Sequence, residues 1–218
     1  MNGRKKVAVL ISGRGSNMMS LISAAMAPDY PAEIALVLSN KPEAGGLQRA
    51  DDLGIKTAVV DHREYKGDRE AFERAVNAIL RDNGIELVVL AGFMRLLTPY
   101  LVNEWRERMI NIHPALLPSF KGLNTHERAL DEGVKLHGAT VHFVSAEMDD
   151  GPIIAQGAVP VLDSDTPDSL AARVLSVEHQ IYPRALELVA SGKARVKGQR
   201  VAISGGSEPS DPTFLIAP

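Results

Sequence analysis

Residues 7–17, VAVLISGRGSN, decide the fold of this chain. The first five are a continuous apolar run, typical of a strand buried on both faces in a parallel sheet that is covered by helices. From Ser16 onward the apolar residues recur at helical spacing, until Pro28 closes the segment. A buried strand joined to a helix by a glycine-rich turn predicts the first unit of a doubly wound α/β sheet.

The same alternation of strand and helix continues along the chain. Apolar runs predict strands at 34–38, 57–60, 87–91 and 109–112, and amphipathic segments predict helices at 47–53 and 69–81. A further helix should begin at Pro99 with Thr98 as its cap. Right-handed crossovers then give a doubly wound, mostly parallel sheet.

The second half of the chain departs from this alternation. Two apolar runs, 139–144 and 153–159, lie close together and predict an antiparallel strand pair added to the sheet. A long helix should follow from Ser169, and we expect a kink or break where Pro183 interrupts the pattern.

Length and composition indicate a soluble α/β protein of ordinary size. The 218 residues predict one domain at 1–203 and a mobile tail at 204–218. The net charge of −3 gives no basic field for a nucleic acid, and the absence of cysteine excludes disulfides and thiolate chemistry. No apolar run is long enough for a signal peptide or a bilayer span. We therefore expect a cytoplasmic protein with no membrane or nucleic-acid partner, whose oligomeric state stays open, a homodimer included.

The glycine-rich turn after the first strand is a candidate anion site. Backbone N–H groups of Gly15, Ser16 and Asn17 would face a ligand at the start of the following helix. A dinucleotide site would need a third glycine where Met18 stands and an acidic residue where Ser39-Asn40 follow the second strand. The pattern thus favours a single phosphate group. The alternative is a tight turn that Ser16 or Asn17 merely caps.

Asn111 and His113 form the most informative pair in the chain. Residues two apart in a strand share a face, and open α/β sheets bind ligands beyond the carboxyl ends of their strands. An amide and a protonated imidazole aimed at one point can stabilise an oxyanion. A nearby carboxylate would raise the pKa of His113, and Asp149 is a candidate in the acidic loop at 147–152. Sequence spacing alone does not bring Asp149 to His113, and the loop could also be a solvated turn.

Several motifs in one order resemble the phosphoribosylglycinamide formyltransferases, a family of folate-dependent formyltransferases. The resemblance extends over about residues 7–200. Its motifs are LISGRGSN at 10–17, VVLAGFMR at 88–95, NIHPALLP at 111–118, HGATVHFV at 137–144, MDDGP at 148–152 and EHQIYP at 178–183.

The resemblance implies an activity and a set of site residues. It implies transfer of the formyl group of 10-formyltetrahydrofolate to the amine of glycinamide ribonucleotide, in de novo purine biosynthesis, with no metal and no covalent enzyme intermediate. It assigns Asn111, His113 and Asp149 to catalysis, with Asp149 raising the pKa of His113, and Glu178 to the acceptor. It assigns the substrate phosphate to Gly15, Ser16 and Asn17. The residues that it assigns to the folate are Arg69, Met94, Arg95, Leu96, Leu97, Asn111 and Val144.

Other functions share parts of this pattern. A methionyl-tRNA formyltransferase would need a further carboxy-terminal domain and a basic surface. A formyltetrahydrofolate hydrolase would usually carry an amino-terminal regulatory domain, whereas the first predicted strand here begins at Val7. A non-catalytic nucleotide-binding module would not need all three candidate catalytic residues.

Overall fold

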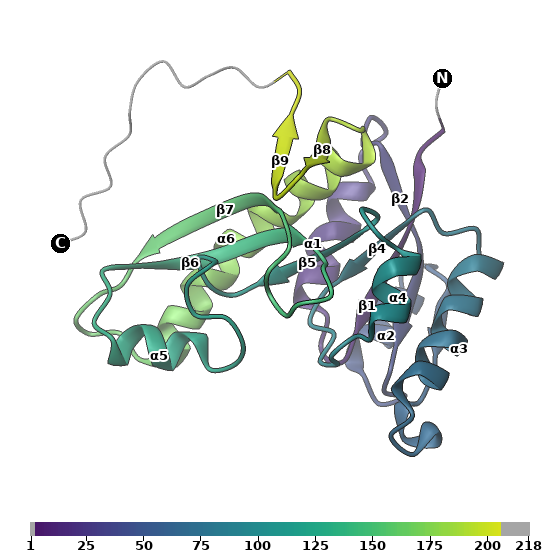
Figure 1. Cartoon of the computed structure of the whole chain (residues 1–218), viewed down its shortest axis with the longest axis horizontal. Coiled ribbons are helices and arrows are strands. Elements are labelled where there is room, and N and C mark those ends of the chain that lie inside the picture. The colour runs from purple at the N-terminus through teal and green to yellow at the C-terminus, as the bar shows by residue number, and fades with distance from the viewer. Residues whose placement is uncertain (1–2, 206–218) are drawn as a thin grey trace.

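A computed structural model of the chain describes residues 3–205 and has a seven-stranded sheet at its centre (Figure 1). The strand order is β3-β2-β1-β4-β5-β6-β7, and the strands from β3 to β5 run parallel. The strands β6 and β7 are antiparallel, both to each other and, for β6, to β5. Their bounds are β1 Lys5–Ile11, β2 Ala32–Ser39, β3 Thr57–Val59, β4 Leu87–Leu90, β5 Met109–His113, β6 Leu136–Phe143 and β7 Ile153–Pro160.

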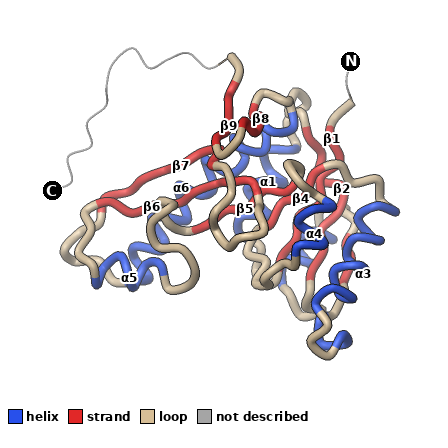
Figure 2. The backbone as a smooth tube through the Cα atoms, in the orientation of Figure 1, coloured by secondary structure: helices blue, strands red, loops and turns tan. Residues whose placement is uncertain are grey.

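Helices cover both faces of this sheet (Figure 2). They are α1 Ser16–Ala25, α2 Gly45–Asp51, α3 Arg69–Asp82, α4 Pro99–Glu104, α5 Thr125–Asp131 and α6 Pro167–Ala190, with a short 3-10 helix η1 at His62–Tyr65. Side chains of β1 alternate between two hydrophobic cores. Val7, Val9 and Ile11 pack with α1 and α6, whereas Ala8 and Leu10 pack with α3 and α4. This alternation explains why β1 is apolar at every position from 7 to 11.

The predicted fold class is therefore confirmed. The parallel strands, the crossover helices and the added antiparallel pair all appear in the expected order. The register between β5 and β6 places Asn111 opposite His142 and His113 opposite Thr140.

Of the kink or break predicted at Pro183, the break is wrong, because α6 continues through it from Pro167 to Ala190, and the kink stays a prediction. Tertiary packing holds this part of the helix. Tyr182 is fully buried and donates its hydroxyl to the carbonyl of Leu90 at 2.8 Å, and the carbonyl of Pro183 accepts from Tyr30 Oη at 2.6 Å. These contacts offset the backbone hydrogen bond that a proline removes from a helix interior.

Thr98 is the N-cap residue of α4, as predicted, but its side chain makes no capping hydrogen bond. The helix α4 does begin at Pro99, but the backbone N–H and the hydroxyl of Thr98 both donate to the buried carboxylate of Glu73 on α3. A competing acceptor in the tertiary structure has replaced the local capping bond.

Some elements did not stand out in the sequence. The helix α5 and the hairpin of β8 (Ala194–Lys197) and β9 (Arg200–Ile203) are short and weakly patterned. The predicted mobile tail at 204–218 mostly lies outside the described residues, since only Ser204 and Gly205 belong to them.

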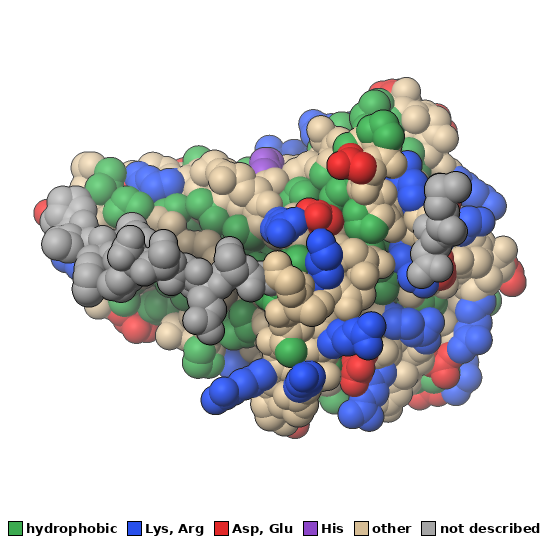
Figure 3. Space-filling model, turned by 90° about the horizontal axis from the view of Figure 1, so that it is seen from above, with side chains coloured by type: hydrophobic (Ala, Val, Ile, Leu, Met, Phe, Trp, Pro, Cys, Tyr) green, Lys and Arg blue, Asp and Glu red, His purple; other side chains and the backbone are tan. Residues whose placement is uncertain are grey.

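Within residues 3–205, no helix has the length and apolar character needed to cross a bilayer. On the face shown in Figure 3, lysine and arginine side chains are interspersed with acidic ones. That face therefore offers no uninterrupted basic surface for a nucleic-acid backbone.

Candidate active site

The turn between β1 and α1 forms a hollow at the carboxyl edge of the sheet. Its volume is about 180 Å³, and its lining residues are Gly13, Arg14, Gly15, Ser16, Asn17, Ala91 and Gly92. Gly15 is the N-cap residue of α1, at φ 72°, and no side chain accepts a hydrogen bond from the first turn. The alternative in which Ser16 or Asn17 caps the helix is thus wrong. The N–H groups of this first turn remain available to an anion.

Glycine is required at position 15 for two reasons. Its φ of 72° is a left-handed conformation that other residues rarely adopt. A Cβ there would also lie 3.0 Å from Met18 Cε and 3.3 Å from Gly46 Cα. The turn can therefore lie close to α2 only without a side chain.

Asn17 and Glu178 connect this hollow to α6. Asn17 Nδ2 donates to Glu178 Oε2 at 2.5 Å, and Glu178 is only 7% exposed. Burial raises the pKa of Glu178, opposed by the hydrogen bond from Asn17 and by the charge of His113. A phosphate-site residue and the candidate acceptor residue, far apart in sequence, therefore lie in contact.

Asn111 is oriented by His142, its cross-strand neighbour. Asn111 Nδ2 lies 3.3 Å from His142 Nε2, and His142 Nδ1 lies 2.9 Å from the carbonyl of Phe143. Burial lowers the pKa of His142, so the ring is neutral. A neutral ring that donates from Nδ1 to the carbonyl must accept at Nε2. Asn111 therefore donates one amide hydrogen to His142 and keeps the second for a ligand.

His113 and Asp149 lie side by side, a contact that sequence spacing left open. His113 Nδ1 lies 3.4 Å from Asp149 Oδ2, and the two side chains are 7% and 11% exposed. Asp149 Oδ2 also accepts the backbone N–H of Gly122 at 2.9 Å, and His113 Nε2 lies 2.9 Å from the carbonyl of Phe120. Both ring nitrogens therefore face oxygen atoms. An imidazole protonated on both nitrogens can donate to both of them.

The connection between β6 and β7 brings Asp149 to this position. Asp149 itself has a φ of 53°, and Asp150 forms an ion pair with Lys121 of the loop after β5. Gly151 packs so closely that a Cβ there would lie 1.7 Å from the carbonyl oxygen of Phe143. The backbone N–H of Phe143 donates to the carbonyl of Pro152 at 2.9 Å and closes the loop. Backbone contact thus fixes the end of the acidic loop. Glu147 and Asp150 are exposed, as in a solvated turn, whereas the side chain of Asp149 is 11% exposed and lies against His113.

The candidate folate residues lie along the loop after β4. Met94 and Leu96 are 66% and 59% exposed, which leaves two large apolar side chains uncovered. The guanidinium of Arg95 lies 5.3 Å from the ring centre of Phe72 on α3. Leu97 and Val144 are partly buried against the core on that side of the sheet.

Arg69 is the first residue of α3 and is exposed. It precedes Phe72 by one helical turn, so the two side chains are neighbours on the helix surface. Since Arg95 lies over Phe72, Arg69 belongs to the same end of the molecule as the loop after β4. The structure gives it no partner among the described residues.

Sequence reasoning missed several residues that shape the site, namely Ser12, Phe120, Gly122 and His142. Their contacts depend on strand register and on loops that meet only in the folded chain. In the part of the chain that the structure describes, no group of three His, Cys, Asp or Glu side chains could hold a metal ion.

The doubly wound sheet, with an amide and an imidazole beside a glycine-rich turn at its carboxyl edge, defines an α/β protein with a candidate site for group transfer. Comparison with known sequences gives the particular family. Residues 5–186 match the model of the family described as "Formyl transferase". The chain belongs to the formyl transferase family.

Characterised relatives agree with this assignment. The phosphoribosylglycinamide formyltransferase of Haemophilus influenzae is 40% identical over 94% of this chain and 96% of its own length. The trifunctional purine biosynthetic protein adenosine-3 of Bos taurus is 49% identical over 88% of this chain, which spans only 19% of that longer protein. A crystal structure of glycinamide ribonucleotide transformylase 1 from Symbiobacterium toebii has a TM-score of 0.90 at 42% identity, covering 93% of this chain and 95% of its own.

Proposed function

We propose that this chain transfers the formyl group of 10-formyltetrahydrofolate to the amine of glycinamide ribonucleotide, a step of purine biosynthesis. The observation that carries the proposal is the convergence of Asn111, His113 and Asp149 beside the anion-binding turn. The activities named for the relatives support the choice of substrates. A cytoplasmic enzyme that binds only small-molecule substrates is part of the same proposal.

The two substrates would approach the site from opposite sides. The phosphate of the acceptor binds in the hollow, where the N–H groups of Gly15, Ser16 and Asn17 and the side chain of Arg14 surround it. Glu178 lies on the far side of Asn17 and binds the glycinamide part through its carboxylate. This order of binding groups leads from the hollow towards His113.

The folate would lie against the loop after β4. The exposed side chains of Met94 and Leu96 offer apolar contact for a flat ring system, and Leu97 and Val144 form the wall behind them. Arg69 is free to bind a carboxylate of the folate tail, since arginine can pair with carboxylates through two hydrogen bonds. The proposal that the folate binds at this loop rests on the exposed apolar side chains of Met94 and Leu96.

The reaction is a direct transfer between the two substrates. The acceptor amine attacks the formyl carbon and forms a new carbon–nitrogen bond, which gives a tetrahedral intermediate with a negative oxygen. The free amide hydrogen of Asn111 donates to this oxygen, and so does the Nε2–H of protonated His113 once it leaves the carbonyl of Phe120. The bond from the formyl carbon to N10 of the folate then breaks. The proton lost by the amine passes to N10, so the products are the formylated acceptor and tetrahydrofolate.

Asp149 acts on this reaction through His113. Its carboxylate lies 3.4 Å from the imidazole and is itself held by the N–H of Gly122. By facing Nδ1, the carboxylate limits the orientations of the ring and leaves Nε2 as the nitrogen that can turn from the carbonyl of Phe120 to the oxyanion. The buried position of both groups strengthens their interaction, because little water screens it.

Hydrolysis of formyltetrahydrofolate is the second candidate, because the same three side chains would stabilise attack by water. The discriminating assay follows the absorbance change on release of tetrahydrofolate, with glycinamide ribonucleotide present and absent. The proposal expects release only with the acceptor. Equal release without the acceptor indicates the hydrolase, and no release under either condition indicates a binding module.

A further inference from the structure

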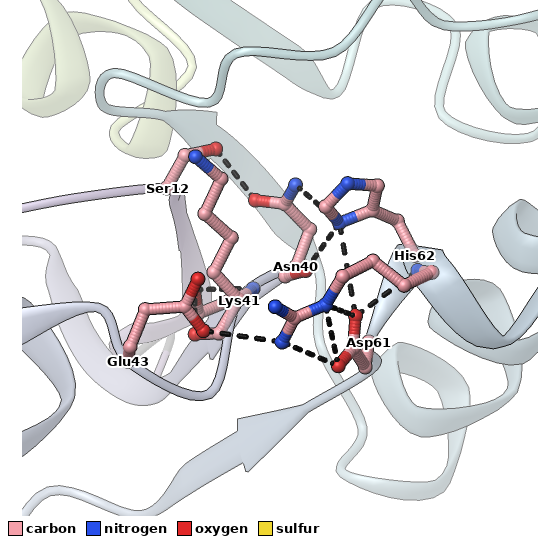
Figure 4. A network of polar contacts seen from close by, with 8 residues as sticks. Ser12, Asn40, Lys41, Glu43, Asp61 and His62 are labelled. Carbon is pink, nitrogen blue, oxygen red and sulfur yellow. Dashed lines mark hydrogen bonds and ion pairs between the residues drawn. The ribbon is translucent and has the colours of Figure 1, made fainter.

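Ser12, the residue between β1 and the anion-binding turn, carries a network that neither the sequence nor the proposed reaction accounts for (Figure 4). It is 7% exposed. Its hydroxyl donates to Asn40 Oδ1 at 2.5 Å, and Asn40 is 1% exposed. The same hydroxyl oxygen accepts the backbone N–H of Met94 at 2.8 Å. One buried hydroxyl therefore bonds to the loops that follow two other strands.

The backbone of Ser12 strengthens the link to the loop after β4. Its N–H donates to the carbonyl of Gly92 at 3.1 Å. Gly92 lines the hollow for the phosphate, and Met94 begins the exposed stretch assigned to the folate. Ser12 thus holds this loop at two points, two residues apart.

Asn40 is held from its other side by His62. The imidazole Nδ1 lies 2.8 Å from the carbonyl of Asn40 and 3.3 Å from its Nδ2 (Figure 4). The backbone N–H of His62 also lies 3.3 Å from the same carbonyl. The acceptor of the Ser12 hydroxyl is therefore fixed in place and cannot readily turn to another partner.

The turn itself is tied to the same arrangement. The backbone N–H of Gly46, in the first turn of α2, donates to the carbonyl of Gly13 at 3.0 Å. Asn40 precedes α2, so the loop after β2 contacts the phosphate turn both through Ser12 and through Gly13. The loops after β1, β2 and β4 thus meet at Ser12.

We propose that Ser12 is a positioning residue that sets the distance between the acceptor's phosphate site and the donor's folate loop. This inference rests on the proposed function, because it concerns the spacing of those two substrates. Transfer between two bound molecules depends steeply on the placement of the reacting atoms, and a displacement of about 1 Å can lower the rate about 100-fold. The hydroxyl of Ser12 can therefore control the placement of both substrates, although it contacts neither of them.

The test compares two variants that each delete one hydroxyl. Ser12→Ala removes the link between the loops. Tyr30→Phe removes the hydroxyl that donates to the carbonyl of Pro183. Tyr30 precedes the amino end of β2, so it lies at the edge of the sheet opposite the candidate site. Ser12→Thr keeps the hydroxyl and serves as the conservative variant. The measurements are kcat, KM for each substrate and Tm of the full chain.

For Ser12→Ala we expect kcat to fall about 10-fold or more and both KM values to rise. Tyr30→Phe lowers Tm and leaves kcat and both KM values at the wild-type level. Ser12→Thr restores most of the lost kcat. Kinetics of Ser12→Ala that match those of Tyr30→Phe, or a change in only one KM, would overturn the inference.

Two further measurements keep the result clear. If Ser12→Ala does not fold, Asn40→Ala removes the same hydrogen bond from the other side and should give the same kinetic pattern; wild-type kinetics in that variant would overturn the inference. Calorimetric titration with inorganic phosphate, and separately with tetrahydrofolate, should show both affinities weakened in the Ser12 variant. Wild-type chain that binds these ligands but catalyses no transfer would contradict the proposed function, while weakened binding of both in Ser12→Ala would still support the positioning role.

Discussion

Replacing Glu178 with glutamine should make this protein more stable and a poorer enzyme. Glu178 is 7% exposed, and burial raises the pKa of its carboxyl. Burying a carboxylate charge costs several kcal/mol, of which a hydrogen bond to the charged group returns about 1.5–3 kcal/mol. In the glutamine variant the side-chain oxygen can still accept from Asn17 Nδ2, which now lies 2.5 Å from the carboxylate. The net gain should be about 1 kcal/mol, which for a chain of this size raises Tm by about 2–4 °C.

The gain in stability of the Glu178→Gln variant should increase with pH. The pKa of Glu178 is raised in the folded state above its ordinary value of 4.5. The stability that this group contributes is therefore complete below pH 4.5 and is lost as the pH rises through the folded-state pKa. The Tm difference between Glu178→Gln and wild type should be largest at neutral and alkaline pH. This Tm difference should shrink towards zero as the pH falls to 4.5, the ordinary pKa of a glutamate.

The transferase activity of the Glu178→Gln variant should fall, although its stability rises. Loss of the carboxylate removes a charged contact to the acceptor, and such contacts contribute about 1.5–3 kcal/mol, or roughly 10-fold or more in kcat/KM for glycinamide ribonucleotide. The KM for the folate should stay unchanged. The assay combines thermal unfolding over a pH series with steady-state kinetics for each substrate.

A matched control is available on the other side of the sheet. Glu73 is also a buried glutamate, and it accepts hydrogen bonds from Thr98. Glu73→Gln should leave the KM for the acceptor unchanged. The reasoning about Glu178 is refuted if its glutamine variant has a lower Tm at neutral pH, or if both glutamine variants change the acceptor kinetics equally.

Three further substitutions test the site. His113→Ala should lower kcat by about two to three orders of magnitude, the usual effect of losing one oxyanion donor, and near-normal turnover would exclude its role. Gly151→Ala should lower kcat at least about 10-fold together with Tm, because its Cβ would lie 1.7 Å from the carbonyl oxygen of Phe143 and displace the loop that carries Asp149; unchanged kinetics would show that this loop tolerates movement. Arg14→Ala should raise the KM for glycinamide ribonucleotide about 10-fold through loss of a charged contact to phosphate. The same variant should not change the KM for the riboside that lacks the phosphate, and an equal change for both acceptors would contradict a phosphate contact.

The sequence predicted the sheet because its signals are local. Continuous apolar strands such as 7–11 can be buried on both faces only between two layers of helices, and β1 does alternate between two cores. The glycine turn and the pair Asn111 and His113 could be found for the same reason, since strand periodicity fixes which side chains share a face.

Local signals were wrong where tertiary packing prevailed. Pro183 would break an isolated helix, but the burial of Tyr182 and its bond to Leu90 hold α6 together. Thr98 does occupy the N-cap position of α4, but its hydroxyl donates to the charged acceptor Glu73 and makes no capping bond.

The sequence by itself determined the strand and helix pattern, the glycine-rich turn and the residue types at the candidate site. Only the tertiary structure decided which distant groups meet: His113 with Asp149, Asn111 with His142, and Asn17 with Glu178. The first two contacts depend on the register between β5 and β6 and on the path of the loop before β7, and the third depends on the packing of α1 against α6. Hydrogen bonding fixes that register between strands distant in the chain, so no spacing within a single segment specifies it.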